Sequence, residues 1–216
     1  MSPPKSEHPR ASQGQPSVPG EPFPQEKKQR LFFALWPDKA LRAQLVRRSK
    51  SLMKAARGRP VPADNLHITL AFLGNVAAQQ RQCLEAMADA IVCPPFELTL
   101  DCAGHWSGSR VLWWAPGVCP EPLSLLVAAL HAGAAECGLS LDDRPYRPHL
   151  TLMRKVSRCP DAMAVDPLRW AASHFALVRS VPIPEGVRYQ VLREWPLAGG
   201  AVDRSVVGIS EKETGD

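Results

Sequence analysis

The chain has 216 residues, of which 45% are hydrophobic and 22% are charged, as in an ordinary globular protein of one domain or two small lobes. Its formal net charge of +5 favours an anionic partner such as nucleic acid, but only weakly. No window approaches the roughly 20 consecutive apolar residues of a membrane span, and the N-terminus lacks the apolar segment of a signal peptide. We therefore expect a cytoplasmic protein.

The two ends of the chain have compositions that do not build a core. Residues 1–28 are rich in Pro, Ser, Gln and charge, which predicts a disordered tail. Residues 198–216 are similar in character and predict a flexible C-terminal tail. The folded domain is expected to span residues 29–197.

Hydrophobic periodicity predicts strands and helices between the tails. The first strand covers 30–35 and has one wholly apolar face and one mixed face. The apolar face consists of Leu31, Phe33 and Leu35, and the mixed face of Arg30, Phe32 and Ala34. A helix follows within 36–53, with Pro and Asp at its start, and a turn at 61–66 leads into a second strand within 65–74.

The remaining segments continue this mixed order. Helices are predicted at 77–91 and 121–137. Strands are predicted at 96–101, within 107–115 after a turn, within 147–155, at 174–180 and at 187–195. The pattern predicts an α+β fold of two related half-domains, each contributing one of two similar strands.

The six cysteines show no C-x-x-C spacing, which argues against a zinc ribbon or a thioredoxin-like site. They lie in apolar or mixed stretches, as buried free thiols do. We therefore expect free thiols in a reducing compartment. The positions are 83, 93, 102, 119, 137 and 159.

Two strands carry the same polar pair inside an apolar run. "NLHITLAFLG" (65–74) contains His67 and Thr69, and "RPHLTLMRK" (147–155) contains His149 and Thr151. Residues i and i+2 of a strand point to one face, so each histidine projects together with its threonine while the flanking leucines and isoleucine face a core. If the half-domains face each other, two imidazoles and two hydroxyls line one cleft.

This set of side chains suits phosphoryl chemistry. A neutral imidazole can take a proton from an attacking water, and a protonated imidazole can give one to the leaving oxygen. The threonine hydroxyls can hydrogen-bond the phosphate oxygens, and Arg154 can add positive charge. A metal site built from the histidines with Asp101 or Asp142 is the weaker interpretation, because no metal-binding spacing such as H-E-x-x-H occurs.

With these motifs the chain resembles the two-histidine phosphoesterases, specifically the bacterial RNA 2′,3′-cyclic phosphodiesterases that were first called 2′-5′ RNA ligases (LigT-like). The resemblance runs over about residues 30–197. It is carried by "RLFFAL", "NLHITLAFLG", "GHWSGSRVLWW" and "RPHLTLMRK".

The resemblance implies a bilobal α+β fold in which two antiparallel sheets, flanked by helices and related by a pseudo-twofold axis, surround a central cleft. It implies hydrolysis of an RNA 2′,3′-cyclic phosphate end to a 2′-phosphate without metal or other cofactor, with 2′-5′ ligation as a related reaction. His67 would be the proton donor and His149 the proton acceptor. Thr69, Thr151 and Arg154 would hold the phosphate.

Two other functions remain open at this point. One is a cyclic phosphodiesterase that acts on a small nucleotide such as ADP-ribose cyclic phosphate, and the other is a non-catalytic module that binds RNA ends. The expected partner is RNA with a 2′,3′-cyclic phosphate end, tRNA fragments being candidates, and the expected state is a monomer. We also predict that Phe32, on the mixed face of the first strand, contacts the nucleotide by stacking.

Overall fold

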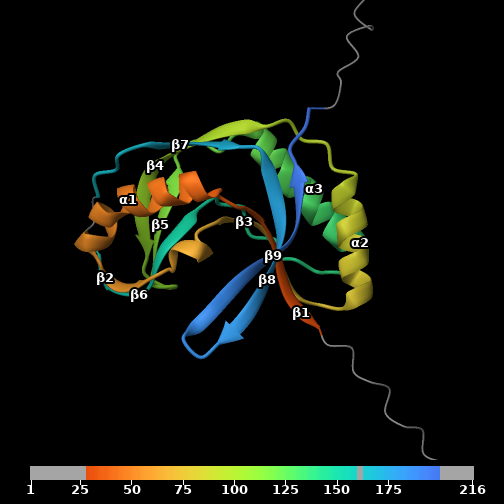
Figure 1. Cartoon of the computed structure of the whole chain (residues 1–216), viewed down its shortest axis with the longest axis horizontal. Coiled ribbons are helices and arrows are strands. Elements are labelled where there is room, and N and C mark those ends of the chain that lie inside the picture. Colours follow the sequence, from red (N-terminus) through yellow and green to blue (C-terminus); the bar gives the residue numbers. More distant parts are fainter. Residues whose placement is uncertain (1–27, 160–162, 200–216) are drawn as a thin grey trace, which may run out of the picture.

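The computed structural model describes residues 28–159 and 163–199 (Figure 1). The two predicted tails lie outside these residues except at their inner ends, where Ala198 forms an isolated bridge with Cys93. Among the described residues, no helix is both long and apolar enough to cross a lipid bilayer.

Helices and strands follow the predicted mixed order. The helices are α1 (Lys39–Ala55), α2 (Ala78–Asp89) and α3 (Glu121–Glu136), and a 3₁₀ turn, η1, covers Ala63–Asn65. The strands are β1 (Gln29–Leu35), β2 (Arg57–Pro60), β3 (Ile68–Val76), β4 (Phe96–Trp106), β5 (Val111–Pro116), β6 (Leu150–Arg158), β7 (Leu168–Ala172), β8 (His174–Ile183) and β9 (Gly186–Pro196). The α+β class predicted from the sequence is therefore confirmed.

Two strands, β2 and β7, were not predicted from the sequence. All four residues of β2 are exposed, and its sequence RGRP contains glycine and proline, so it has no hydrophobic alternation to detect. By contrast, β7 alternates between buried and exposed residues, but it is only five residues long. Both strands exist because an already formed neighbour, β6 or β4, offers its hydrogen-bonding edge.

The described strands form one continuous antiparallel sheet rather than the two separate sheets that were expected. The order is β7-β4-β5-β6-β3-β1-β8-β9, with β2 paired to β6. Among the described residues, β3 and β6 pair at one position, where Ile68 lies opposite Leu150. Both strands start at this pair and run apart, which divides the sheet into two wings without separating them.

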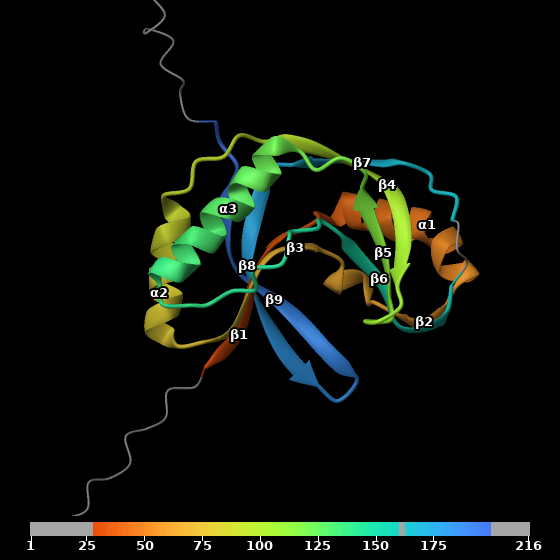
Figure 2. The ribbon, with the colours of Figure 1, turned by 180° about the vertical axis from the view of Figure 1, so that it is seen from behind.

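The two wings carry their own helices (Figures 1 and 2). The wing with β2 and β4–β7 is covered by α1, which contacts β2, β6 and β7. The wing with β1, β3, β8 and β9 is covered by α3, which contacts β3, and by α2, which packs on α3. The chain passes between the wings several times, so neither wing is a continuous segment of the sequence.

The faces of β1 have the predicted composition. Leu31, Phe33 and Leu35 are fully buried in the main core beneath the helices. On the other face, Phe32 and Ala34 are also buried, in a smaller cluster. Trp36, Ala176 and Val178 complete this cluster. Ala176 and Val178 of the neighbouring strand β8 extend this second face, and Tyr189 and Val191 of β9 pack against it. Phe32 contacts His67 on this side of the sheet.

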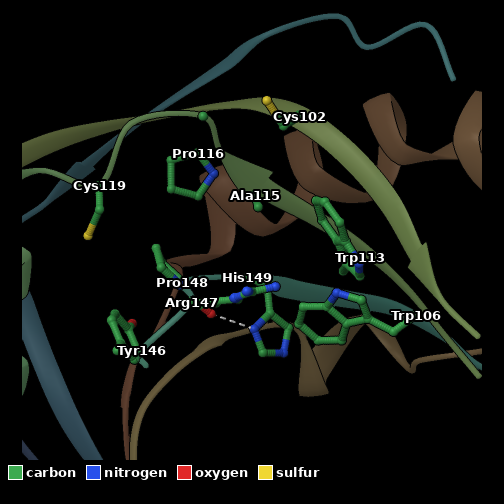
Figure 3. Close-up of a pocket in the computed structure, with 11 residues that line it drawn as sticks. Cys102, Trp106, Trp113, Ala115, Pro116, Cys119, Tyr146, Arg147, Pro148 and His149 are labelled. Carbon is green, nitrogen blue, oxygen red and sulfur yellow. Dashed lines mark hydrogen bonds between the residues drawn. The ribbon is translucent and has the colours of Figure 1, made fainter. Parts of the chain in front are cut away.

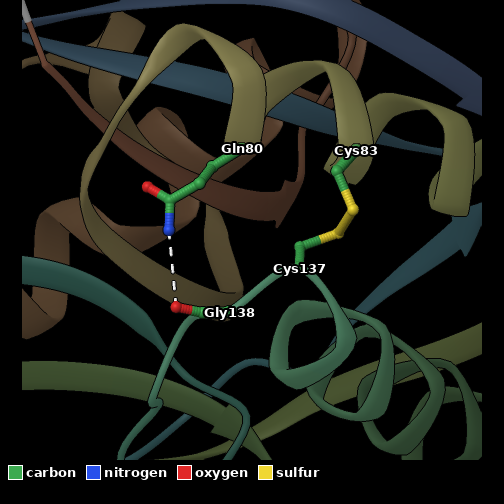
Figure 4. The surroundings of a disulfide bond; sticks show 4 residues. All are labelled: Gln80, Cys83, Cys137 and Gly138. Carbon is green, nitrogen blue, oxygen red and sulfur yellow. Dashed lines mark hydrogen bonds between the residues drawn. A yellow bond between two sulfur atoms is a disulfide. The ribbon is translucent and has the colours of Figure 1, made fainter.

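The expectation that all cysteines are free thiols was wrong for two of them. Cys83 of α2 and Cys137 at the end of α3 form a disulfide, with Cα atoms 5.8 Å apart (Figure 4). Beside it, the Gln80 side-chain amide donates a hydrogen bond to the Gly138 carbonyl at 3.4 Å. The two cysteines lie 54 residues apart, so only the packing of α2 on α3 brings their sulfur atoms together.

Candidate active site

The two His-x-Thr motifs meet where β3 joins β6. An antiparallel pair between Ile68 and Leu150 places Thr69 opposite His149 and His67 opposite Thr151. Directly opposite residues point to the same face, so all four side chains lie on one side of the sheet. The central residues, Ile68 and Leu150, are fully buried on the other side. An antiparallel pair has local twofold symmetry, so the two motifs are related by a twofold axis at this point.

Both histidines are held in the same way through the backbone. His67 Nδ1 lies 2.7 Å from the carbonyl oxygen of Asn65, and His149 Nδ1 lies 2.8 Å from that of Arg147. Since a carbonyl can only accept a hydrogen bond, each Nδ1 carries the proton. In the neutral state each Nε2 is therefore unprotonated and can accept a proton. In each case the partner is the carbonyl two residues upstream, so the two imidazoles have equivalent tautomers.

An aromatic cage surrounds the imidazole of His67. Trp36 stacks on it with ring centroids 5.5 Å apart, and Tyr189 meets it edge-on at 5.1 Å. Phe32 lies on a third side at 4.9 Å. This apolar surround disfavours the charged imidazole, and Arg154 and His149 add repulsion, so the pKa of His67 is lowered to about 4.

The imidazole of His149 contacts the ring of Trp106, whereas that of His67 contacts three aromatic rings. The ring of Trp106 meets that of His149 edge-on at 4.6 Å, and Trp106 is in turn packed against Trp113 at 5.5 Å. Burial is the main cause that lowers the pKa of His149, and the charge of Arg154 acts in the same direction. Both imidazoles are therefore neutral near pH 7 when the site is empty.

A cavity of about 340 Å³ opens beside His149 (Figure 3). Its wall includes Trp113, whose indole packs over Gly104 of the neighbouring strand. A Cβ at position 104 would come within 2.3 Å of the Trp113 ring. Only glycine fits at this position, and the indole in turn supports Trp106. The residues that line the cavity are Cys102, Trp106, Trp113, Ala115, Pro116, Gly117, Cys119, Tyr146, Arg147, Pro148 and His149.

The predicted phosphate-binding residues lie around the histidines. Thr69 Oγ1 is 3.0 Å from His67 Nε2, so this hydroxyl already faces the imidazole. Thr151 is half-buried and opposite Trp113 in the register of β5 and β6. Arg154 is exposed, and its charge acts on both histidines. The sequence-predicted set is therefore brought together at one place.

Asn65 ties His67 to the β8–β9 hairpin. Its side-chain amide donates to the Val187 carbonyl at 2.7 Å, and its Oδ1 accepts from the Tyr189 amide at 3.2 Å. Its own carbonyl holds His67, as described above. This buried residue thus fixes the imidazole and the aromatic ring of Tyr189 relative to each other.

Phe32 lies next to His67 as expected, but its surface is not available. Only 3% of the residue is exposed, because Tyr189 covers it edge-on at 5.0 Å. A base cannot stack on a ring that is already enclosed. The structure assigns Phe32 a packing contact with His67, and the predicted stacking would require a rearrangement.

Several residues of this site were not predicted from the sequence. Trp36 continues the alternation of Phe32 and Ala34, so the period-two pattern could have found it. Trp106 lies within the GHWSG segment quoted for the resemblance. Tyr146, whose hydroxyl donates to the Thr69 carbonyl at 3.1 Å, and Tyr189 had no signal, since their proximity depends on strand order.

The described residues contain no cluster of three or more His, Cys, Asp or Glu side chains arranged to hold a metal ion. What the site offers is two imidazoles with unprotonated Nε2 atoms, two hydroxyls and one guanidinium. That set can move protons and bind an anion.

Comparison with known proteins agrees with this geometry. The family model described as 2′-5′ RNA ligase superfamily matches residues 36–181, which include both motifs. The RNA 2′,3′-cyclic phosphodiesterase of Escherichia coli is 39% identical over 173 residues, covering 78% of this chain and 97% of that protein. The protein of the same name from Thermus thermophilus is 30% identical over 198 residues, covering 87% of this chain and 100% of that protein.

A solved structure has the same fold. Escherichia coli LigT complexed with 3′-AMP superposes with a TM-score of 0.69 at 39% identity, covering 79% of this chain and 98% of that one. The resemblance drawn from the sequence is thereby confirmed. The chain belongs to the 2′-5′ RNA ligase superfamily and, within it, to the family of the RNA 2′,3′-cyclic phosphodiesterases.

Proposed function

We propose that this protein hydrolyses 2′,3′-cyclic phosphate ends of RNA to 2′-phosphomonoester ends. The observation that carries the proposal is the twofold arrangement of His67 and His149, in which each Nδ1 is fixed on a carbonyl and each neutral Nε2 can accept a proton. The names of the relatives from Escherichia coli and Thermus thermophilus support this substrate.

The proposed step is an in-line displacement at phosphorus. His149 Nε2 takes a proton from water as the water oxygen attacks the phosphorus, and the bond from phosphorus to the 3′ oxygen breaks. His67 Nε2 gives its proton to that 3′ oxygen, which leaves a free 3′-hydroxyl and a 2′-phosphate. The two imidazoles belong on opposite sides of the phosphate, as their twofold relation allows.

His67 needs a proton before it can act as the donor, yet its pKa is about 4 in the empty site. A bound cyclic phosphate is an anion beside the imidazole, and its charge offsets that of Arg154, so it favours the protonated ring. The substrate therefore helps to create the state in which His67 is an acid. Thr69 and Thr151 hydrogen-bond the non-bridging oxygens, and Arg154 balances their charge.

The same geometry accepts an alcohol in place of water. Attack by the 5′-hydroxyl of a second RNA, with the 3′ oxygen again leaving, would give a 2′-5′ phosphodiester. We include this ligation as a minor reaction of the same site.

We further propose that residues 29–197 form the catalytic unit. In this proposal the protein works as a monomer in the cytoplasm.

The test is conversion of a short RNA with a 2′,3′-cyclic phosphate end, with the position of the product phosphate identified. His67→Ala and His149→Ala should each lower kcat by about 10²–10⁴-fold. The control is His131→Ala, because this histidine lies on α3, which packs on the side of the sheet opposite the motif side chains, and its variant should keep wild-type kinetics.

Wild-type activity should persist in EDTA, since the proposed groups supply both the proton transfers and the charge. Activity that EDTA abolishes and a divalent ion restores would overturn the metal-independent mechanism. A 3′-phosphate product would overturn the assignment of the 3′ oxygen as the leaving group. Turnover of a cyclic-phosphate derivative of ADP-ribose but not of RNA would identify a small-nucleotide enzyme instead.

A further inference from the structure

Arginines stand directly opposite each other on β2 and β6. Arg57 pairs with Arg158, and Arg59 pairs with Arg154, in an antiparallel register that shifts between Arg57 and Arg59. All four residues are exposed. Like charges directly opposite across a sheet destabilise it, so this arrangement carries a cost in the free protein.

The arginines of β2 point away from the core. A Cβ built on Gly58 would come within 3.0 Å of Val156, which is buried in the main core, so position 58 faces inward. Adjacent residues of a strand point to opposite faces, and therefore Arg57 and Arg59 face outward. Arg154 is directly opposite Arg59, which places it on the same outward side. Arg158 is opposite Arg57, beyond a shift in the register, and is exposed at the end of β6.

No carboxylate neutralises these four arginines among the described residues. Other arginines of the chain are paired with acids, for example Arg48 with Asp166 at 2.9 Å and Arg81 with Glu85 at 2.6 Å. Arg59 is held instead by a backbone contact, because its guanidinium donates to the Glu185 carbonyl at the turn of the β8–β9 hairpin. The four arginines form what we call the arginine strip.

The arginine strip begins at the candidate active site. Arg154 is at its near end, and its charge reaches both His67 and His149. Arg158 and Arg57 lie further along the same two strands, away from the β3–β6 junction. An anionic chain whose end sits between the histidines could thus continue along β2 and β6 with its charges beside the strip.

We propose that the arginine strip binds the phosphate backbone of the RNA segment that lies on the 5′ side of the cyclic end. This inference rests on the proposed function, because a cyclic phosphate occupies the 3′ terminus and the rest of the strand must leave the site in the 5′ direction. The strip makes a polynucleotide the preferred substrate over a mononucleoside cyclic phosphate.

The experiment compares two substrates, a mononucleoside 2′,3′-cyclic phosphate and a ten-nucleotide RNA with the same end, in the variant Arg57→Gln/Arg158→Gln. The ratio of kcat/KM for the RNA to kcat/KM for the mononucleotide should fall roughly tenfold at low salt. In the wild type, log(kcat/KM) for the RNA should fall with log salt concentration. The variant should reduce that slope by about 1.4, because each lost phosphate contact on a single strand removes about 0.7.

The matched control is Arg47→Gln/Lys50→Gln, which removes the same charge from α1 on the covered side of the sheet. It should leave the substrate ratio and the salt slope near their wild-type values. If the substrate ratio falls equally in the two double variants, net charge alone explains the effect and the proposal is wrong. An unchanged ratio in Arg57→Gln/Arg158→Gln would also contradict RNA binding by the arginine strip. If the wild type hydrolyses neither substrate, the proposed function fails instead, and the two failures are distinguishable.

Discussion

At the scale of single residues, the main finding is that the site lowers the pKa of both histidines. Apolar rings around His67 and burial of His149 remove water that would solvate the charged imidazole. The proposed mechanism needs one imidazole protonated and the other neutral, so under it the shifts set the pH of highest activity.

The pH profile of kcat/KM should be bell-shaped, with its maximum below pH 6.5. This profile reports the free enzyme, in which the pKa of His67 is about 4 and that of His149 is below its ordinary value of 6.5. The rate should rise through the lower pKa and fall through the higher one. The kcat profile should peak at higher pH, because bound phosphate raises the pKa of both imidazoles. Steady-state kinetics from about pH 3 to 9 at constant ionic strength would measure both profiles, and a kcat/KM maximum above pH 7 would contradict the shifts.

Phe32→Ala should act on stability and on the pKa of His67. Removing a ring that is 3% exposed leaves a cavity, and the free energy of unfolding should fall by about 3–5 kcal/mol. Water entering beside His67 should raise its pKa toward 6.5, because burial is the main cause of its lowering. Denaturant unfolding and an NMR titration measure the two effects.

Phe32→Leu is the matched control for that variant, since it keeps much of the volume and should show smaller changes in both measurements. If Phe32→Ala instead keeps the wild-type stability and raises KM for RNA, the stacking role predicted from the sequence would be correct.

At the scale of elements, the disulfide between Cys83 and Cys137 joins the two helices that cover the wing with β1, β3, β8 and β9. A cross-link over 54 residues restricts the unfolded chain, so Cys83→Ser should lower the free energy of unfolding by about 2–4 kcal/mol under oxidising conditions. Wild-type protein in excess reductant should unfold at the same denaturant concentration as the variant. Thiol labelling of the denatured, unreduced protein supplies the check, and labelling of all six cysteines would show that the bond does not form.

At the scale of the whole molecule, the sheet brings together residues that the chain keeps far apart. The wings meet at Ile68 and Leu150, and the β8–β9 hairpin reaches back to η1 through Asn65. Because the chain crosses between the wings, the environment of each histidine comes from several segments. Trp36 and Tyr189 enclose His67, although they belong to opposite ends of the described chain.

Elements with strong periodicity, and the polar pairs within them, could be predicted from the amino-acid sequence alone. The faces of β1 and the inward positions of Ile68 and Leu150 followed from the alternation of side chains in a strand, which is a local property. His67, Thr69, His149 and Thr151 were found because polar side chains at period two stand out against apolar neighbours. The family followed from the same motifs.

Other features depend on contacts between segments that are distant in the chain. The continuity of the sheet, the pairing of Cys83 with Cys137, and the arginine pairs of β2 and β6 depend on which elements become neighbours. The exposed strand β2 has no pattern of its own, since its hydrogen bonds come from β6. The burial of Phe32 was hidden for the same reason. A strand pattern tells which residues share a face, but the neighbouring strand and the hairpin above it decide whether that face is open to a ligand.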